Sequence, residues 1–153
     1  MGELTDSAPG ATSAVPDRLD LEAFLAELRH EPHPVLFYPN PGNAGDALIA
    51  HATHQLFDRV GLKYEWVGDH RRLDLGARVV VYGGGGNLVP PYDTASRVLR
   101  WADRGAKRVI LLPHTISGLE DLLAALGPQT DLICRELVSF RHVRGAVRSA
   151  HCH

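Results

Sequence analysis

The feature that most constrains this chain is the alternation of short, uninterrupted apolar runs with longer stretches of helical periodicity. The runs are rich in β-branched residues and are bounded by Pro, Gly or charged residues: Val35–Tyr38, Lys63–Val67, Arg78–Tyr82, Arg108–Leu112 and Leu132–Cys134. Strands that are apolar on both faces are typical of a parallel sheet that is covered on both sides. The chain is therefore expected to form parallel strands joined by helices.

Apolar residues recur every three or four positions between these runs, as in amphipathic helices. The longest such stretch runs from Ala47 to Val60 and is followed by Gly61, a residue that favours a helix end. Further helices are predicted at residues 17–30, 93–104, 119–126 and from about 136. The predicted fold class is α/β: a Rossmann-like open parallel sheet with helices on both faces. Right-handed crossovers then bring every strand-to-helix loop to one edge of the sheet.

The length of 153 residues suits one domain. Residues 1–16 are rich in Ser, Thr, Ala, Gly and Pro and are predicted to be a disordered leader. Residues 17–143 are assigned to the α/β domain. Residues 144–153 show no strand pattern and are expected to form an irregular tail, an end that suggests truncation.

Charge and apolar content exclude several classes of protein. A net charge of −2 argues against broad attraction to nucleic acid or anionic membranes, although a local basic site is still allowed. No apolar run reaches the length of a membrane span, and the first residues lack the features of a signal peptide. Two cysteines, Cys134 and Cys152, are too few for a disulfide framework, so a cytoplasmic location is expected.

The loop after the first predicted strand contains Asn43, Gly45 and Asp46 and opens the longest helix. Glycine lets a backbone approach a ligand closely, and free N–H groups at a helix start attract anions. Asp46 would compete with a bound anion there. Alternatively, Asn43 or Asp46 only caps the helix.

Four consecutive glycines, Gly83–Gly86, follow the third strand and precede Asn87. Such a run costs backbone entropy, so it is expected where dihedrals are unusual or where the chain lies against a ligand. The alternative is a flexible loop. The spacing matches neither the dinucleotide-binding nor the P-loop fingerprint.

Two later strand ends carry reactive side chains. His114 and Thr115 follow the fourth strand, where His114 could act as an acid or base or could be a buried structural histidine. Ser117 and Glu120 form a capping-box pattern at the next helix. Arg135 follows the fifth strand and could bind a phosphate or carboxylate, or pair with a neighbouring acid.

No metal or other cofactor is expected. His51 and His54 lie three residues apart on one helix face, but the sequence supplies no third ligand nearby.

Four motifs occur in order at the predicted strand ends: GNAGDALI at 42–49, VVYGGGGNLVPPY at 80–92, ILLPHTISG at 110–118 and ICRELVSF at 133–140. Together they resemble the amino-terminal half of the polysaccharide pyruvyl transferase family, over about residues 35–142. The resemblance implies transfer of a pyruvyl group from phosphoenolpyruvate, a co-substrate, to a sugar of a surface polysaccharide. It also implies a fold like one half of a GT-B-type two-domain transferase.

The same resemblance implies site residues. Asp46 would orient or deprotonate the acceptor hydroxyl, and His114 would act as an acid or base, although many family members have Gln at that position. Contacts to substrate would come from Asn43, Gly45, Gly84, Gly85, Gly86, Asn87, Thr115 and Arg135.

Family members are about twice as long as this chain, so the resemblance implies an activity that is incomplete without a second domain, in cis or in trans. The expected partners are phosphoenolpyruvate and a glycan or lipid-linked sugar acceptor, with no nucleic acid. Two alternatives stay open at this point: a non-catalytic remnant or sugar-binding module, and a glycosyltransferase that uses a sugar nucleotide.

Overall fold

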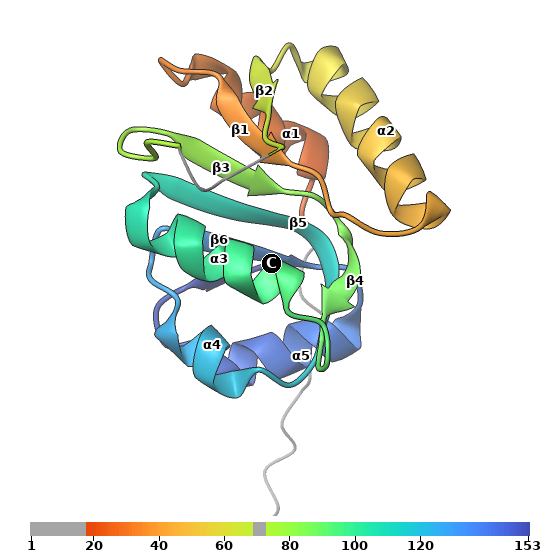
Figure 1. Cartoon of the computed structure of the whole chain (residues 1–153), viewed down its shortest axis with the longest axis vertical. Coiled ribbons are helices and arrows are strands. Elements are labelled where there is room, and N and C mark those ends of the chain that lie inside the picture. Colours follow the sequence, from red (N-terminus) through yellow and green to blue (C-terminus); the bar gives the residue numbers. More distant parts are fainter. Residues whose placement is uncertain (1–17, 69–72) are drawn as a thin grey trace, which may run out of the picture.

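The computed structural model describes residues 18–68 and 73–153, so the predicted leader lies outside the described residues. Within these ranges the chain forms one sheet of seven strands in the order β2-β1-β3-β5-β6-β7, with β4 paired to β5 (Figure 1). All of these strand pairs are parallel. The strands are β1 (Val35–Tyr38), β2 (Tyr64–Trp66), β3 (Val79–Tyr82), β4 (Gly85–Leu88), β5 (Arg108–Ile116), β6 (Thr130–Cys134) and β7 (His151–Cys152).

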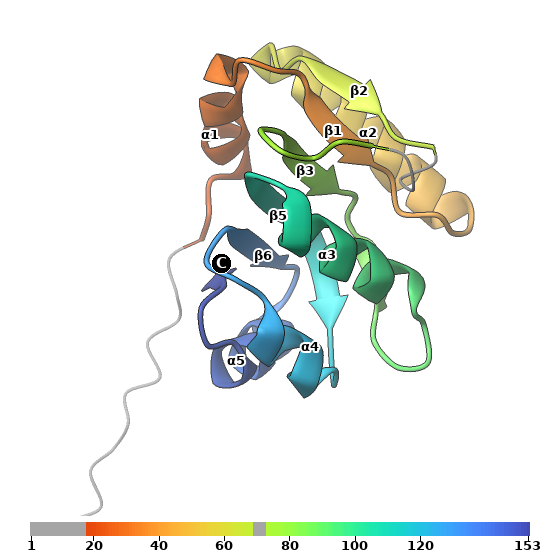
Figure 2. The ribbon, with the colours of Figure 1, turned by 60° about the vertical axis from the view of Figure 1, so that its left-hand side comes forward.

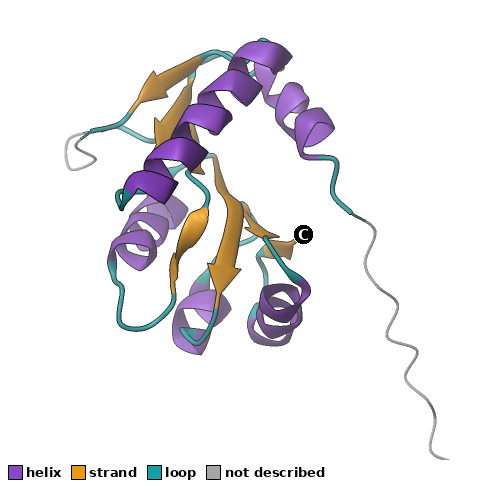
Figure 3. Ribbon diagram, turned by 90° about the vertical axis from the view of Figure 1, so that its right-hand side faces the viewer, coloured by secondary structure: helices purple, strands orange, loops and turns teal. Residues whose placement is uncertain are grey.

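Helices cover both faces of the sheet, which confirms the predicted fold class. One face carries α1 and α2, and the other carries α3, α4 and α5 (Figures 2 and 3). No helix among the described residues is long and apolar enough to cross a membrane. The helices are α1 (Leu21–Ala26) with the 3₁₀ turn η1 (Glu27–His30), α2 (Ala44–Val60), α3 (Thr94–Gly105), α4 (Glu120–Ala125) and α5 (Leu137–Ala146).

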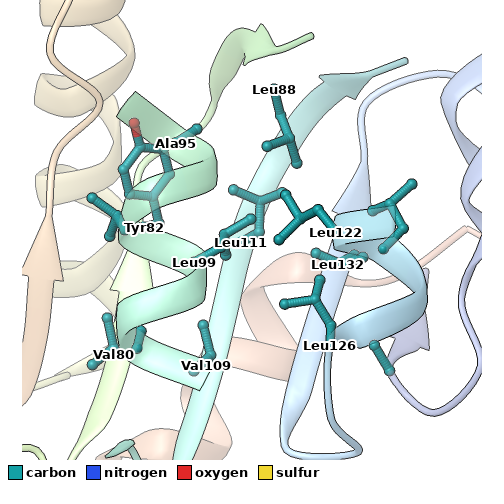
Figure 4. Packing of buried hydrophobic residues seen from close by; sticks show 14 of the residues in the cluster. Val80, Tyr82, Leu88, Ala95, Leu99, Val109, Leu111, Leu122, Leu126 and Leu132 are labelled. Atoms are coloured by element: carbon teal, nitrogen blue, oxygen red, sulfur yellow. The ribbon is translucent and has the colours of Figure 1, made fainter. Parts of the chain in front are cut away.

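Strand β3 shows why the apolar runs are uninterrupted. Side chains alternate across a strand, so Val79 and Val81 pack with α1 and α2. Val80 and Tyr82 face the opposite way and pack with α3 (Figure 4). Because both faces are buried, every position of the strand favours an apolar side chain.

The fourth predicted strand does not end at Pro113. Strand β5 continues through Pro113, His114 and Thr115 to Ile116. A register shift between Leu111 and His114 accommodates the proline, because a bulge does not need the N–H that proline lacks. The predicted loop at His114 is therefore wrong.

Two smaller predictions also fail. The helix after β5 begins at Glu120, and its cap residue is Leu119, at φ 62°, with no side-chain capping bond, so Ser117 does not cap it. The glycine run is not a loop throughout, since Gly85 opens β4 and pairs with His114 of β5.

The carboxyl-terminal ten residues are not irregular throughout. Helix α5 extends to Ala146, and His151–Cys152 form β7, which pairs in parallel with β6. Backbone bonds of Cys134 and His153 close this last pairing. Cys134 and Cys152 are free thiols with their sulfurs 3.9 Å apart.

Candidate functional site

A cleft of about 530 Å³ lies at the edge of the sheet where the parallel strands end. Three of the four motif segments line it, and the fourth lies directly beneath, because His114 bonds to Asn87 of the lining. This is the edge at which open α/β sheets bind ligands. The lining residues are Pro41, Gly42, Asn43, Gly45, Asp46, Ile49, Gly85, Gly86, Asn87, Tyr92 and Arg135.

Asn43 and Asp46 cap helix α2 and line the cleft at the same time. The Asn43 side chain accepts from the Gly45 N–H at 2.8 Å, and Asp46 Oδ2 accepts from the Asn43 N–H at 3.0 Å. Both residues therefore cap α2, and both also line the cleft. Capping fixes the direction of the Asp46 carboxylate, so it favours a defined role in the cleft rather than excluding one.

The amide of Asn40 links the motif segments to one another. It is 6% exposed, and its Nδ2 donates to Asp46 Oδ1 at 2.9 Å. Its Oδ1 accepts from the Tyr82 hydroxyl at 2.8 Å and from Asn87 Nδ2 at 2.7 Å. Sequence reasoning missed Asn40 and Tyr82. The available signal was an amide placed directly after an apolar strand, where a buried polar group needs several partners.

His114 lies beneath the cleft and is fully buried. Its Nε2 lies 2.9 Å from Asn87 Oδ1 and 3.3 Å from the Asn87 backbone nitrogen. Nε2 donates to Asn87 Oδ1 in one tautomer and accepts from the Asn87 backbone N–H in the other. Nδ1 is buried without a hydrogen-bond partner among the described residues. Hydrogen bonds through Asn87 and Asn40 thus link His114 to the Asp46 carboxylate.

Burial, and to a smaller extent the nearby Arg135 charge, lower the pKa of His114 to about 4, against weaker opposing effects of Asp46 and the Gly83 backbone. Burial likewise raises the pKa of Tyr82 above its usual range. His114 is uncharged at neutral pH and lies outside the cleft lining. Its geometry suits a residue that positions Asn87 rather than one that exchanges a proton with a ligand.

Close packing explains most of the glycine run. A Cβ on Gly83 would lie 2.7 Å from the Asn40 nitrogen, one on Gly84 would lie 2.9 Å from the Pro113 carbonyl, and one on Gly85 would overlap the Asn40 amide. Only at Gly86 is there open space. None of these four glycines has a positive φ, so the expectation of unusual dihedrals is wrong. Gly84 packs against the protein and does not line the cleft.

The motif around residues 133–140 divides into two parts. Glu136 and Ser139 tie α5 to β5, because Ser139 Oγ accepts from the Ile116 N–H at 2.8 Å and donates to Glu136. Thr115 also donates to Glu136, at 3.4 Å, and does not line the cleft. Arg135 instead reaches the cleft with its side chain 56% exposed.

Asp46 and Arg135 are the charged residues of the cleft lining. The Nε of Arg135 lies 3.8 Å from Glu136, a loose pair that leaves guanidinium donors for an anion. A fixed carboxylate can orient a hydroxyl group and accept its proton. The cleft lining thus holds one carboxylate and one guanidinium group among its described residues.

The described residues contain no group of three His, Cys, Asp or Glu placed to hold a metal ion. His54 Nδ1 bonds to the Tyr64 hydroxyl at 2.8 Å, and His51 Nε2 lies 3.2 Å from Gln55.

No protein-family model matches the sequence, and no curated protein matches it. Among solved structures, the chain is similar to the crystal structure of a functionally uncharacterised protein from Klebsiella pneumoniae, with a TM-score of 0.72 and 27% sequence identity. The similarity covers 87% of this chain and 53% of the Klebsiella chain, so this chain spans about half the length of that protein.

Proposed function

We propose that this chain is the amino-terminal domain of a polysaccharide pyruvyl transferase, which transfers a pyruvyl group from phosphoenolpyruvate to a sugar of a surface polysaccharide. The observation that carries the proposal is the convergence of the four motif segments around one cleft. Polar residues that come from distant parts of the sequence and line one cavity are typical of a ligand site.

The proposed reaction assigns roles to the two charged residues of the cleft. Two sugar hydroxyl oxygens bond to C2 of phosphoenolpyruvate, its methylene carbon gains a proton, and phosphate leaves. Asp46 would take a proton from an attacking hydroxyl. Arg135 would bind the phosphate or carboxylate of the donor. His114 is not assigned as the proton donor, because it is buried and uncharged at neutral pH.

The proposed enzyme needs more than this chain. The region of similarity covers only 53% of the solved Klebsiella protein, and the cleft is open at the sheet edge. We therefore propose that a second α/β domain, in the same protein or in another chain, faces this cleft in a GT-B-like arrangement. Because phosphoenolpyruvate is a cytoplasmic metabolite, the proposal carries a cytoplasmic location with it.

A non-catalytic glycan-binding module is the second candidate. The observation that favours it is that His114 is uncharged at neutral pH and lies outside the cleft lining. Among the described residues of the lining, Asp46 is then the one carboxylate or imidazole that could exchange a proton. Asn43, Asn87 and Tyr92 of the same lining offer the amides and aromatic ring that suit sugar hydroxyls and ring faces.

The test is phosphate release from phosphoenolpyruvate with a lipid-linked sugar acceptor, measured on this chain alone and with any separately encoded second domain. We expect Arg135→Ala to reduce turnover by about 10²-fold, the order found when one donor to a developing charge is removed. Arg104→Ala is the matched control, since Arg104 bonds to its own helix at the Arg100 carbonyl. Equal turnover in both variants would remove Arg135 from the site.

Titrations distinguish the candidates. Glycan binding with no phosphate release in any combination would favour the binding module. Binding of a sugar nucleotide without binding of phosphoenolpyruvate would favour a glycosyltransferase and contradict pyruvyl transfer.

A further inference from the structure

A second cavity adjoins the cleft on the side of strand β2. This aromatic hollow measures about 330 Å³ and shares Pro41 and Gly42 with the cleft, so the loop after β1 forms a wall of both. The described residues that line it carry no charge: Tyr38, Pro39, Asn40, Pro41, Gly42, Ala47, Ala50, Trp66, Val67 and Gly68.

The Trp66 ring in the aromatic hollow is both exposed and held in place. Its residue is 57% exposed, although an indole ring gains free energy when it is buried. The His54 ring stacks on it at a centroid distance of 5.0 Å and an interplanar angle of 10°, and the Phe37 ring meets it edge-on at 5.9 Å. The Tyr64 hydroxyl in turn holds His54. A ring fixed in this way loses little conformational entropy when a ligand packs on it.

The composition of the hollow selects a class of ligand. An uncharged lining gives no reason to bind a phosphate or carboxylate. A fixed aromatic ring beside small apolar side chains suits the C–H face of a pyranose ring, whose hydroxyl groups can point to solvent. A neutral sugar residue fits these conditions.

We propose that the aromatic hollow is a second sugar subsite, in which Trp66 packs against the residue next to the one in the cleft. The inference rests on the proposed function, because it extends the glycan acceptor of that function. The subsite makes the acceptor of the proposed function an oligosaccharide or polymer of at least two residues, bound across the Pro41–Gly42 wall.

The test measures how affinity depends on glycan length. The chain is titrated with mono-, di- and tetrasaccharides of glucose, galactose and mannose, and binding is followed by calorimetry. We expect the longer glycans of at least one series to bind about tenfold more tightly than their monosaccharide, a factor in the range of one good aromatic contact. Trp66→Ala should abolish this gain.

Trp66→Phe is the matched variant, since it keeps an aromatic ring on β2 and should retain most of the gain. Circular dichroism of both variants shows whether they fold, so that a folding defect is not mistaken for a loss of glycan binding. Affinity that does not depend on glycan length, or no binding by any member of the panel, would overturn the subsite. A Trp66→Ala variant that changes only the oligomeric state would also overturn it and indicate protein contacts at the edge strand β2.

The two proposals fail separately. Phosphate release with no effect of Trp66 on glycan length preference would leave pyruvyl transfer standing and remove the subsite. A Trp66-dependent length preference without phosphate release would do the reverse.

Discussion

Single residues of the cleft are connected through the amide of Asn40, which receives two donors and supplies one. This arrangement holds Asp46 in one direction, and it depends on glycines that let the Asn40 segment approach β3 and β4. The free-energy cost of four consecutive glycines is therefore explained at three positions by packing inside the protein. At Gly86 the neighbouring space belongs to the cleft.

Gly83→Ala and Gly86→Ala should differ in their effect on stability. The added Cβ at position 83 would meet the Asn40 backbone nitrogen at 2.7 Å, where no side chain can give way. We expect the free energy of unfolding to fall by about 1–3 kcal/mol, as in overpacked cores. A Cβ at position 86 would have nothing within 4 Å, so Gly86→Ala should change the free energy of unfolding by no more than about 0.5 kcal/mol. Urea denaturation of both variants checks this, and equal effects would contradict it.

Asn40→Ala should destabilise the protein more than Tyr82→Phe. The first variant leaves the Tyr82 hydroxyl and Asn87 Nδ2 without their acceptor, a loss of about 1–3 kcal/mol. The second removes one donor from an acceptor that keeps another, a loss of about 1 kcal/mol. Denaturation midpoints measure both. An Asn40→Ala variant as stable as the wild type would show that the network does not form.

His114 should make stability depend on pH. Its pKa is about 4 in the folded protein and about 6.5 in the unfolded chain, so between these values the unfolded chain binds more protons. The free energy of unfolding should therefore rise with pH from about 4 to 6.5, by up to about 3 kcal/mol from this group. Above pH 6.5 its contribution is constant.

His114→Gln is the reference for that measurement, because Gln keeps a donor and an acceptor but does not titrate. The difference between the two stability curves isolates His114 from the other titrating groups. Parallel curves between pH 4 and 6.5 would contradict a buried, neutral His114.

Secondary structure elements with an apolar pattern were predictable from the sequence, and elements without one were not. Strands β1, β3 and β6 carry side chains on both faces, so their apolar runs mark them. Strand β4 begins with two glycines and carries few side chains to show a period, and β7 has two residues. Pro113 predicts a strand end because proline lacks the N–H of the ladder, and the register shift in β5 accommodates it.

The residues of the candidate site were also predictable only in part. Placement at strand ends was enough to predict the residues that line the cleft, among them Asp46, Gly86, Asn87 and Arg135. It could not separate them from Gly84, His114 and Thr115, which have the same placement but do not line the cleft. The direction of a side chain depends on register and bulges, and neither leaves a clear mark on the sequence.

Ser139→Ala should loosen the attachment of α5 to β5. It leaves the Ile116 N–H without its acceptor in a buried place, so we expect a loss of about 1–3 kcal/mol. Hydrogen exchange should report faster opening of α5 than of α2. Val138→Ala on the exposed side of α5 is the control and should change stability by about 0.5 kcal/mol or less. Unchanged exchange in Ser139→Ala would contradict this attachment.

The fold of the whole molecule brings Asn43, Asp46, Asn87 and Arg135 to one edge of the sheet. The aromatic hollow extends that edge toward β2. Among the residues that line the cleft, Pro41 comes first in the sequence and Arg135 comes last. The parallel strands bring them together in space. A ligand that spans the cleft would therefore contact segments from the first and last thirds of the chain.

Amide chemical shifts of the ¹⁵N-labelled chain, recorded while a tetrasaccharide of the panel is added in the presence of phosphoenolpyruvate, test this directly. We predict shifts that saturate together at residues 43–46, at residues 85–87 and at Arg135, with none at Arg104 near the end of α3. Shifts confined to one of these segments, or located away from the strand ends, would contradict a single cleft shared by the four motifs.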